Sequence, residues 1–153
     1  MELEQCKDHF LCIDSNCFNR FINTLIDIYK QNLYEYNNIV KKYGYYLKPI
    51  HIVTKRRGLN TKTYVYYGRY WYKLYSNGSR IKWIYIGLTK PLKELPDPPI
   101  NPLTFITISL DQDLRTCICI DEKHRNVLRT LISSTINGED NCINRVAKLL
   151  LYS

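Results

Sequence analysis

The chain has 153 residues, of which 45% are hydrophobic and 24% are charged, and its formal net charge is +8 at pH 7. This length allows one domain or two very small ones, and this composition excludes a wholly disordered chain. No run approaches the roughly 18 apolar residues of a membrane span, and the polar N-terminus lacks the apolar region of a signal peptide, so we expect an intracellular protein with no membrane partner.

The N-terminal segment contains three of the six cysteines of the chain. Without a signal peptide, the simplest interpretation is that these cysteines are buried free thiols. Disulfides are the alternative if the source is a hyperthermophile, whose intracellular proteins form them. Zinc is a third interpretation, because four potential ligands fall within 12 residues, although their spacing matches no familiar zinc motif. These ligands are Cys6, His9, Cys12 and Cys17.

A long helix is predicted from about residue 15 to residue 42, because apolar residues recur there every three or four positions. Asp14 or Ser15 can cap its start, and Gly44 can end it. A helix of about 28 residues would be about 42 Å long, which exceeds the width of a domain of this size. We therefore expect either a kink or a contact between the two subunits of a homodimer.

Residues 45 to 90 have the composition of β-strands, with many Tyr, Ile, Val and Thr. We expect three antiparallel strands, at residues 45–53, 61–75 and 80–88. Gly68 is expected to mark a bulge or bend that divides the second strand.

Asn77-Gly78 is the strongest hairpin signal in the chain, because both positions of such a turn need a positive φ. Taken as a two-residue turn, it places Lys73 directly opposite Lys82, which is unfavourable unless an anion lies across the pair. Alternation then sorts the side chains into two faces. One face is apolar and aromatic, with Tyr70, Tyr72, Leu74, Ile81, Trp83 and Tyr85. The other is cationic, with Arg69, Trp71, Lys73, Tyr75, Arg80 and Lys82.

The charge pattern around this hairpin points to a polyanionic partner. From residue 36 to residue 93 the chain has no Asp or Glu in 58 residues, but it has 13 Lys and Arg, 11 of the 14 Tyr and both Trp. The remainder carries a net charge of −5. Clustered like charges repel one another, and cations interleaved with aromatic rings suit phosphate contact and base stacking. We therefore predict nucleic-acid binding by the cationic face, with double-stranded DNA favoured over RNA.

Each residue type has an expected role in this interface. Lys and Arg contact phosphates or base edges, and Trp71 and Tyr75 stack on bases or wedge between them. A basic loop after the first strand contacts the nucleic-acid backbone. The predicted binding residues are Lys55, Arg56, Arg57, Arg69, Trp71, Lys73, Tyr75, Arg80 and Lys82. The alternative is that these cations merely keep the outer face of the hairpin soluble.

Five of the six prolines lie between Pro91 and Pro102, which predicts an extended linker without helix or strand. After it we expect two strands, at 104–110 and 115–120, and then two helices, at about 121–135 and 140–152.

The fold class is therefore predicted to be α+β: a long N-terminal helix, a central antiparallel sheet with an Asn-Gly hairpin, and a C-terminal ββαα element. We expect three parts. Residues 1–93 bind nucleic acid, residues 94–102 form the linker, and residues 103–153 serve packing or dimerisation.

The run Tyr72-Lys73-Leu74-Tyr75-Ser76-Asn77-Gly78, followed by Lys82, Tyr85 and Gly87, resembles a known pattern. It is similar to the N-terminal β-sheet DNA-binding domain of integrases from spindle-shaped archaeal viruses, which are tyrosine recombinases. In such domains a three-stranded sheet lays one face on DNA. The resemblance covers about 30 of 153 residues, at 62–90. No His-x-x-Arg follows the sheet, so the resemblance implies binding without strand cleavage.

The composition, rich in Ile and Tyr and poor in Ala, also resembles that of uncharacterised proteins of those viruses. It implies a viral protein from a thermophilic host.

The order of strand, helix, Gly138 and helix after residue 115 also resembles half of a ribbon-helix-helix dimer. Such dimers pair their strands and place the outward residues in the major groove. These residues would be Arg115, Cys117 and Cys119.

Three other functions are open at this point. The cationic face could bind an acidic host protein, or it could bind RNA, because sheets rich in aromatic residues also stack unpaired bases. Asp97 or Asp111 with Asp121-Glu122-Lys123 is similar to the carboxylate and lysine set of metal-dependent nucleases. We favour a non-enzymatic DNA-binding regulator or accessory factor that needs no cofactor.

Overall fold

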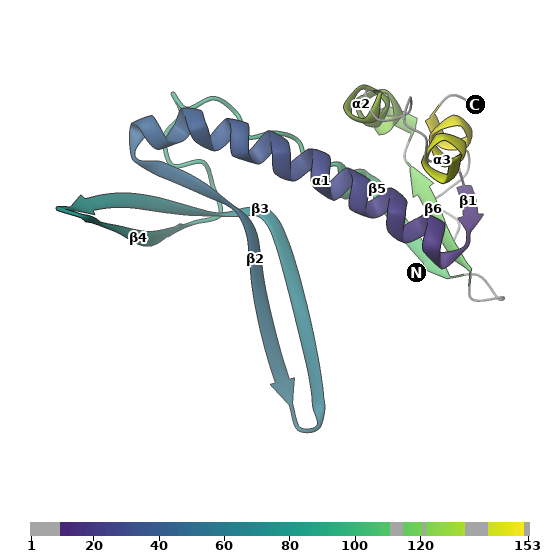
Figure 1. The fold of residues 1–153 in the computed structure, drawn as a ribbon, viewed down its shortest axis with the longest axis horizontal. Coiled ribbons are helices and arrows are strands. Elements are labelled where there is room, and N and C mark those ends of the chain that lie inside the picture. The colour runs from purple at the N-terminus through teal and green to yellow at the C-terminus, as the bar shows by residue number, and fades with distance from the viewer. Residues whose placement is uncertain (1–9, 111–114, 121, 134–140, 152–153) are drawn as a thin grey trace. The chain divides into compact units, whose positions relative to one another are not determined.

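The computed structural model describes residues 10–110, 115–120, 122–133 and 141–151 (Figure 1). These residues form helices and two separate three-stranded antiparallel sheets, which confirms the predicted α+β class. They divide into two compact units. The first unit includes the chain up to Ile28 and from Pro102 onward, and the second unit is Tyr29–Asn101.

Helix α1, Ser15–Val40, contributes to both units. The Asp14 carboxylate accepts a hydrogen bond of 2.9 Å from the Cys17 backbone N–H, which caps the start of the helix. A short 3-10 turn, η2 (Lys41–Tyr43), follows α1, and Gly44 then ends the helical segment with a φ of 81°. The predicted helix and both of its ends are therefore confirmed.

The first unit contains the sheet β1-β6-β5, the short 3-10 turn η3 and two helices. Its core combines one end of α1 with residues of β6, α2 and α3, as the buried cluster Phe21, Leu25, Ile118, Ile120, Leu128, Ile132, Val146 and Ala147 shows. Among the described helices of the chain, none is both long and apolar enough to cross a membrane. The bounds are β1 Phe10–Ile13, η3 Pro102–Phe105, β5 Ile106–Leu110, β6 Thr116–Ile120, α2 Glu122–Ile132 and α3 Asn141–Leu151.

The predicted ββαα element is thus confirmed, but strand β1 was not predicted. β1 has only four residues and no clear alternation, so its sequence alone does not indicate a strand. It pairs with β6, which places β6 in the middle of the sheet. The ribbon-helix-helix alternative is therefore wrong, because both edges of β6 are already paired and Cys117 is buried.

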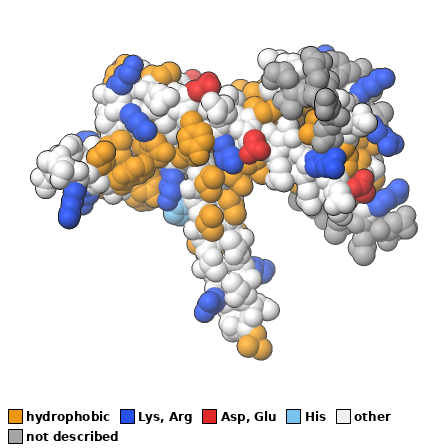
Figure 2. Space-filling model, viewed as in Figure 1, with side chains coloured by type: hydrophobic (Ala, Val, Ile, Leu, Met, Phe, Trp, Pro, Cys, Tyr) orange, Lys and Arg blue, Asp and Glu red, His pale blue; other side chains and the backbone are white. Residues whose placement is uncertain are grey.

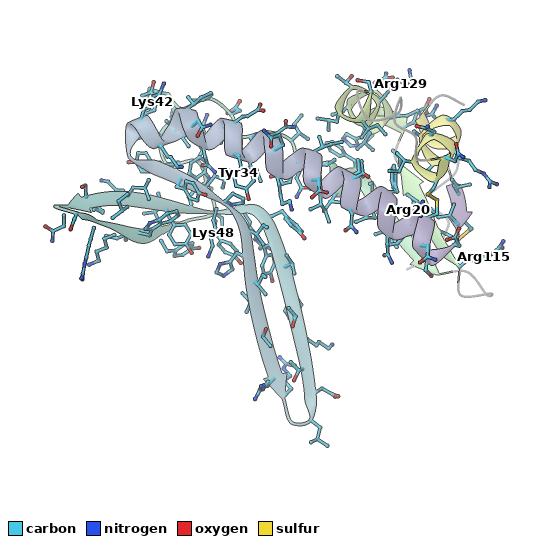
Figure 3. All side chains as sticks on the ribbon, in the orientation of Figure 1. Arg20, Tyr34, Lys42, Lys48, Arg115 and Arg129 are labelled. Atoms are coloured by element: carbon cyan, nitrogen blue, oxygen red, sulfur yellow. A yellow bond between two sulfur atoms is a disulfide. The ribbon has the colours of Figure 1, made fainter. Side chains whose placement is uncertain are left out.

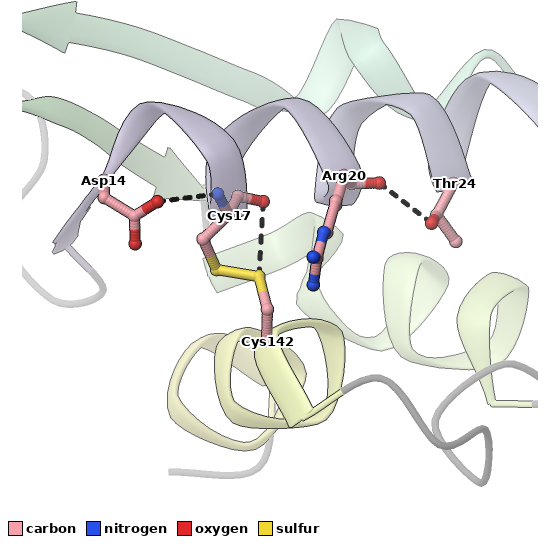
Figure 4. The surroundings of a disulfide bond; sticks show 5 residues. All are labelled: Asp14, Cys17, Arg20, Thr24 and Cys142. Carbon is pink, nitrogen blue, oxygen red and sulfur yellow. Dashed lines mark hydrogen bonds between the residues drawn. A yellow bond between two sulfur atoms is a disulfide. The ribbon is translucent and has the colours of Figure 1, made fainter.

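Disulfides join distant parts of the first unit. Cys12 bonds to Cys117, directly across the β1–β6 pair, and Cys17 at the start of α1 bonds to Cys142 at the start of α3 (Figure 4). Cys119 is disulfide-bonded as well, and no described cysteine is a free thiol.

The expectation of free thiols is therefore wrong. The zinc set is excluded in this oxidised structure, because the sulfurs of Cys12 and Cys17 are already bonded. Cys6 and His9 lie outside the described residues. Within the described ranges, no cluster of His, Cys, Asp and Glu could hold a metal ion.

The second unit contains the sheet β2-β3-β4, formed by β2 (Tyr45–Arg57), β3 (Asn60–Asn77) and β4 (Arg80–Gly87). The three predicted strands are present, and β2 is longer than expected. The basic cluster from Lys55 to Arg57, expected in a loop, is the end of β2. The core of this unit is Tyr29, Leu33, Tyr36, Val40, Leu47, Trp71 and Leu95.

The proline-rich segment has no helix or strand from residue 88 to residue 101, as predicted. It is nevertheless part of the second unit. Leu95 is buried in the core, and the Tyr36 hydroxyl donates a hydrogen bond of 2.7 Å to the Pro96 carbonyl oxygen. The observed division of the chain therefore differs from the expected three parts, since the core residues along α1 change from one cluster to the other after Ile28.

Gly68 divides β3 as expected. Its φ is 55°, and the β2–β3 register shifts between Lys48 and Ile50, opposite this glycine. A Cβ at Gly68 would lie 2.9 Å from Tyr29 Cζ and 3.1 Å from Leu33 Cδ1. The backbone at the bulge therefore approaches α1 too closely for any other residue.

Candidate nucleic-acid interface

The hairpin of β3 and β4 turns one residue later than predicted. Asn77 pairs with Arg80, so the turn residues are Gly78 and Ser79. Lys82 then lies opposite Tyr75 and Lys73 lies opposite Ile84, so the predicted pairing of Lys73 with Lys82 is wrong. Each β3 residue near the turn therefore pairs with a β4 residue two positions further along the chain than predicted. A shift of two positions keeps every side chain near the turn on its predicted face.

Helix α1 covers the Trp71 end of the face that was predicted to bind nucleic acid. Trp71 is only 2% exposed and packs against Tyr36 of α1, with the ring centroids 6.1 Å apart. Leu47, opposite Trp71 on β2, is buried beside it. The predicted stacking role of Trp71 is therefore wrong, because no base can reach its ring. Tyr75, further along the same face, is 44% exposed.

The opposite face of the sheet is open and aromatic. Trp83 is 47% exposed and Tyr85 is 53% exposed, and both belong to the apolar and aromatic face, for which no binding role was predicted. Seven rings form a continuous series of contacts across this face, with neighbouring centroids 4.6 to 6.4 Å apart. We call this series the aromatic ladder. Its members, in order of contact, are Tyr46, Trp83, Tyr72, Tyr85, Tyr70, Tyr66 and Tyr64.

Cations lie over the rings of the ladder. Lys48 Nζ is 5.7 Å from the Tyr72 centroid, and Lys41 and Lys55 lie similarly over Tyr46 and Tyr64. Arg69 Cζ is 4.7 Å from the Tyr66 centroid. Figure 2 shows hydrophobic side chains gathered over the sheet with Lys and Arg around them, and Figure 3 labels Lys48.

The predicted binding residues are therefore divided between two faces. Arg69 was expected beside Lys73, but the bulge at Gly68 turns it onto the ladder. Lys73 stays on the helix side, where its Nζ is 5.0 Å from the Tyr75 centroid. A side-chain hydrogen bond to Tyr75 raises the pKa of Lys73. Lys82 lies opposite Tyr75 on this side, and Arg80 alternates in phase with Lys82.

No carboxylate among the described residues neutralises the cations of the sheet. An ion pair of 2.6 Å joins Lys90 to Asp97 in the second unit. None of the described cations from Lys41 to Lys82 forms an ion pair with a described acid. Asp97, one candidate carboxylate of the nuclease alternative, is thus paired, while Asp111 and Asp121 lie outside the described residues.

An open pocket of about 240 Å³ lies at the Tyr46 end of the ladder. Tyr34 of α1 and Lys48 of β2, both labelled in Figure 3, line it. Burial, and then the neighbouring Tyr34, raise the pKa of Tyr46. The remaining lining residues are Pro49, Ile50 and Trp83. The pocket is continuous with the ladder, because Tyr46 and Trp83 belong to both, and its lining includes a cation.

One signal for the open face was present in the sequence. Six of the seven ladder residues lie on β3 and β4, where tyrosines and one tryptophan occupy alternate positions, and each buried Tyr hydroxyl would need a hydrogen-bond partner. A face with so many hydroxyls is poorly suited to a dry core. The face with Leu47 and Trp71 is the better one to bury.

No family model, curated protein or solved structure matches this chain. Its function must therefore be inferred from geometry and charge.

Proposed function

We propose that this protein is a non-enzymatic DNA-binding protein, a regulator or accessory factor of viral or mobile-element type, that binds through the open face of β2-β3-β4. One observation carries the proposal. A continuous ladder of seven aromatic rings is flanked by cations that no described carboxylate neutralises. Such a surface suits a polyphosphate that also offers flat rings and sugars.

The cations and the aromatic residues of this face have different roles in binding. Lys41, Lys48 and Arg69 donate hydrogen bonds to phosphate oxygens, and their contacts with the rings of the ladder keep them on this face. Trp83 and Tyr85, the ladder residues on β4, present exposed rings to sugars or bases. Each stacked base contributes about 1–3 kcal/mol.

The two tryptophans allow a direct test, because Trp71 is buried while Trp83 is 47% exposed. We expect titration with DNA to quench the fluorescence of the wild type and of Trp71→Phe, and to leave that of Trp83→Phe unchanged. Replacing Trp83 with Ala should weaken binding about 5- to 150-fold. With four to six phosphate contacts, the plot of log K against log salt should have a slope of about −4 to −5 for duplex DNA.

Charge reversal on the two faces supplies the matched control. Lys48→Glu with Arg69→Glu should abolish binding, while Lys73→Glu with Lys82→Glu on the helix side should weaken it by no more than the reversal of two distant charges. The opposite ranking would place the interface on the covered side. The titrations use duplex DNA, single-stranded DNA and RNA, and the tightest binding is expected for duplex DNA. Binding to polyglutamate but to no nucleic acid would favour the acidic protein partner instead.

We propose the cytoplasm of a thermophilic host cell as the setting and a homodimer as the active form. The disulfides of the first unit support the thermophilic host, because intracellular proteins of hyperthermophiles are rich in them. Light scattering at working concentration measures the oligomeric state.

A further inference from the structure

The hairpin of β2 and β3 extends beyond the three-stranded part of the sheet. β4 pairs only with residues 71–77 of β3, so residues 50–67 pair with each other alone. We call this two-stranded segment the arm. Residues 54–65 are all exposed, and Figure 1 shows no other element of the second unit against the end of the arm. A two-stranded ribbon without a covering layer is marginally stable in water. A role in binding explains why the chain maintains it.

The arm is cationic, and its charges are placed unfavourably for an isolated ribbon. Lys55 lies directly opposite Lys62, and Arg56 and Arg57 follow on the same strand. Like charges directly across a strand pair are destabilising. The whole arm contains no acidic residue that could offset them. A polyanion lying along the ribbon reverses the sign of this interaction.

An apolar residue stands at the tip of the arm. The turn is Gly58-Leu59, and the Leu59 side chain is fully exposed. Figure 2 shows hydrophobic atoms at the end of this ribbon. Turns usually carry Gly, Asn, Asp or Ser, whose polar groups suit water. Since Leu59 is fully exposed, it contributes nothing to folding by burial.

We propose that the arm enters the minor groove of duplex DNA and that Leu59 inserts between two base pairs and kinks the duplex. Proteins that bend DNA insert apolar wedges of this kind and kink the duplex by about 20–90° toward the major groove. The minor groove is about 6 Å wide, which admits the slender Gly58-Leu59 tip, and the kink opens the groove for the cations behind it. This inference rests on the proposed nucleic-acid binding, but different residues carry it.

The wedge predicts a preference for paired bases. An inserted side chain needs a stack of base pairs to separate, whereas unpaired bases can stack on the ladder rings outside the arm, such as Trp83 and Tyr85. Replacing Leu59 should therefore affect duplex DNA and leave single-stranded DNA unaffected. Replacing Trp83 should affect both.

The experiment measures bending and affinity separately. A duplex of about 30 base pairs carries a fluorescent donor and acceptor at its two ends, and energy transfer at saturating protein reports the end-to-end distance. Leu59→Ser is compared with Leu88→Ser, which removes another exposed leucine of the second unit, 51% exposed. We expect the wild type and Leu88→Ser to bring the duplex ends closer. Leu59→Ser should bind on the order of tenfold more weakly and leave the duplex straight. Leu59→Phe should restore bending.

Four results would overturn the inference. The first is duplex binding by the wild type without bending, and the second is equal bending by Leu59→Ser. The third is an equal loss of affinity for single-stranded DNA in Leu59→Ser. The fourth is binding to anionic lipid vesicles that depends on Leu59, together with no bending of DNA. The first three leave the proposed function standing, whereas a protein that binds no nucleic acid at any salt concentration refutes both.

Discussion

Replacing Gly68 with Ala tests which face of the sheet is covered, and therefore which face is open to a ligand. A Cβ at this position would lie 2.9 Å from Tyr29 Cζ and 3.1 Å from Leu33 Cδ1. Both side chains belong to the buried core, with Tyr29 3% exposed and Leu33 not exposed at all. Neither can move aside without disturbing the packing of α1 on β3.

Two costs add at this site. The φ of 55° is left-handed, which costs an L-residue about 1–2 kcal/mol. Overpacking of the core costs about 1–3 kcal/mol more. Gly58→Ala and Gly78→Ala are matched controls, because their φ values are 59° and 63° and nothing lies within 4 Å of an added Cβ. They should carry the backbone cost alone.

The assay is urea unfolding followed by Trp71 fluorescence, in a Trp83→Phe background so that the signal comes from the core. We expect Gly68→Ala to lower the free energy of unfolding by about 2–5 kcal/mol and the two controls to lower it by about 1–2 kcal/mol. Equal losses in all three variants would show that α1 does not pack on β3 at the bulge. The assignment of the open face would then be wrong.

Three further predictions concern the framework around the interface. The Asn37 amide donates a hydrogen bond of 2.8 Å to the Leu47 carbonyl oxygen and accepts one of 2.9 Å from the Leu47 N–H. Asn37→Ala leaves both of these buried groups unpaired, so it should lower the free energy of unfolding in urea by about 2–4 kcal/mol. A smaller loss of unfolding free energy than that caused by an alanine substitution at an exposed position of α1 would contradict this prediction. The double variant Cys17→Ser, Cys142→Ser removes a disulfide between residues 125 positions apart and should lower the free energy of thermal unfolding by about 2–5 kcal/mol. Its affinity for DNA should be unchanged, because the second unit has no cysteine. Burial, and then the negative charge of Asp97, raise the pKa of Tyr36 to about 12. Burial also raises the pKa of Tyr29 to about 12. The folded state therefore holds these protons more tightly than the unfolded state does, so the contribution of the two tyrosines to stability should be constant below pH 10 and be lost between pH 10 and 12. The free energy of unfolding should fall less steeply in Tyr36→Phe over this range, and an unchanged slope in that variant would refute the contribution of Tyr36.

Features with local causes were predictable. The apolar period of α1, the cap at Asp14 and the glycine at Gly44 act within a few residues, and each is observed where it was expected. The bulge at Gly68 was also predicted, since an isolated glycine in a strand has a local meaning. The hairpin was predicted, but its register was off by two residues, because Asn77-Gly78 and Gly78-Ser79 are both acceptable turns.

Features that join distant residues were not predictable. The disulfides connect cysteines 105 and 125 residues apart, and nothing in their spacing indicates these pairs. Strand β1 forms because its backbone pairs with the edge of β6, which is more than 100 residues away in the chain. The face that α1 covers depends on a contact between Tyr36 and Trp71, 35 positions apart, and both faces of the hairpin carry aromatic residues at the right period.

The amino-acid sequence by itself determined that this protein has a long helix, a three-stranded basic and aromatic sheet, and a segment of 58 residues in which no acid offsets the cations. Only the tertiary structure decided that Trp71 is in the core and Trp83 in solvent, and that Arg69 belongs with the ladder. The physical reason is that alternation assigns side chains to two faces of a strand, whereas the packing of another element decides which of those faces meets water.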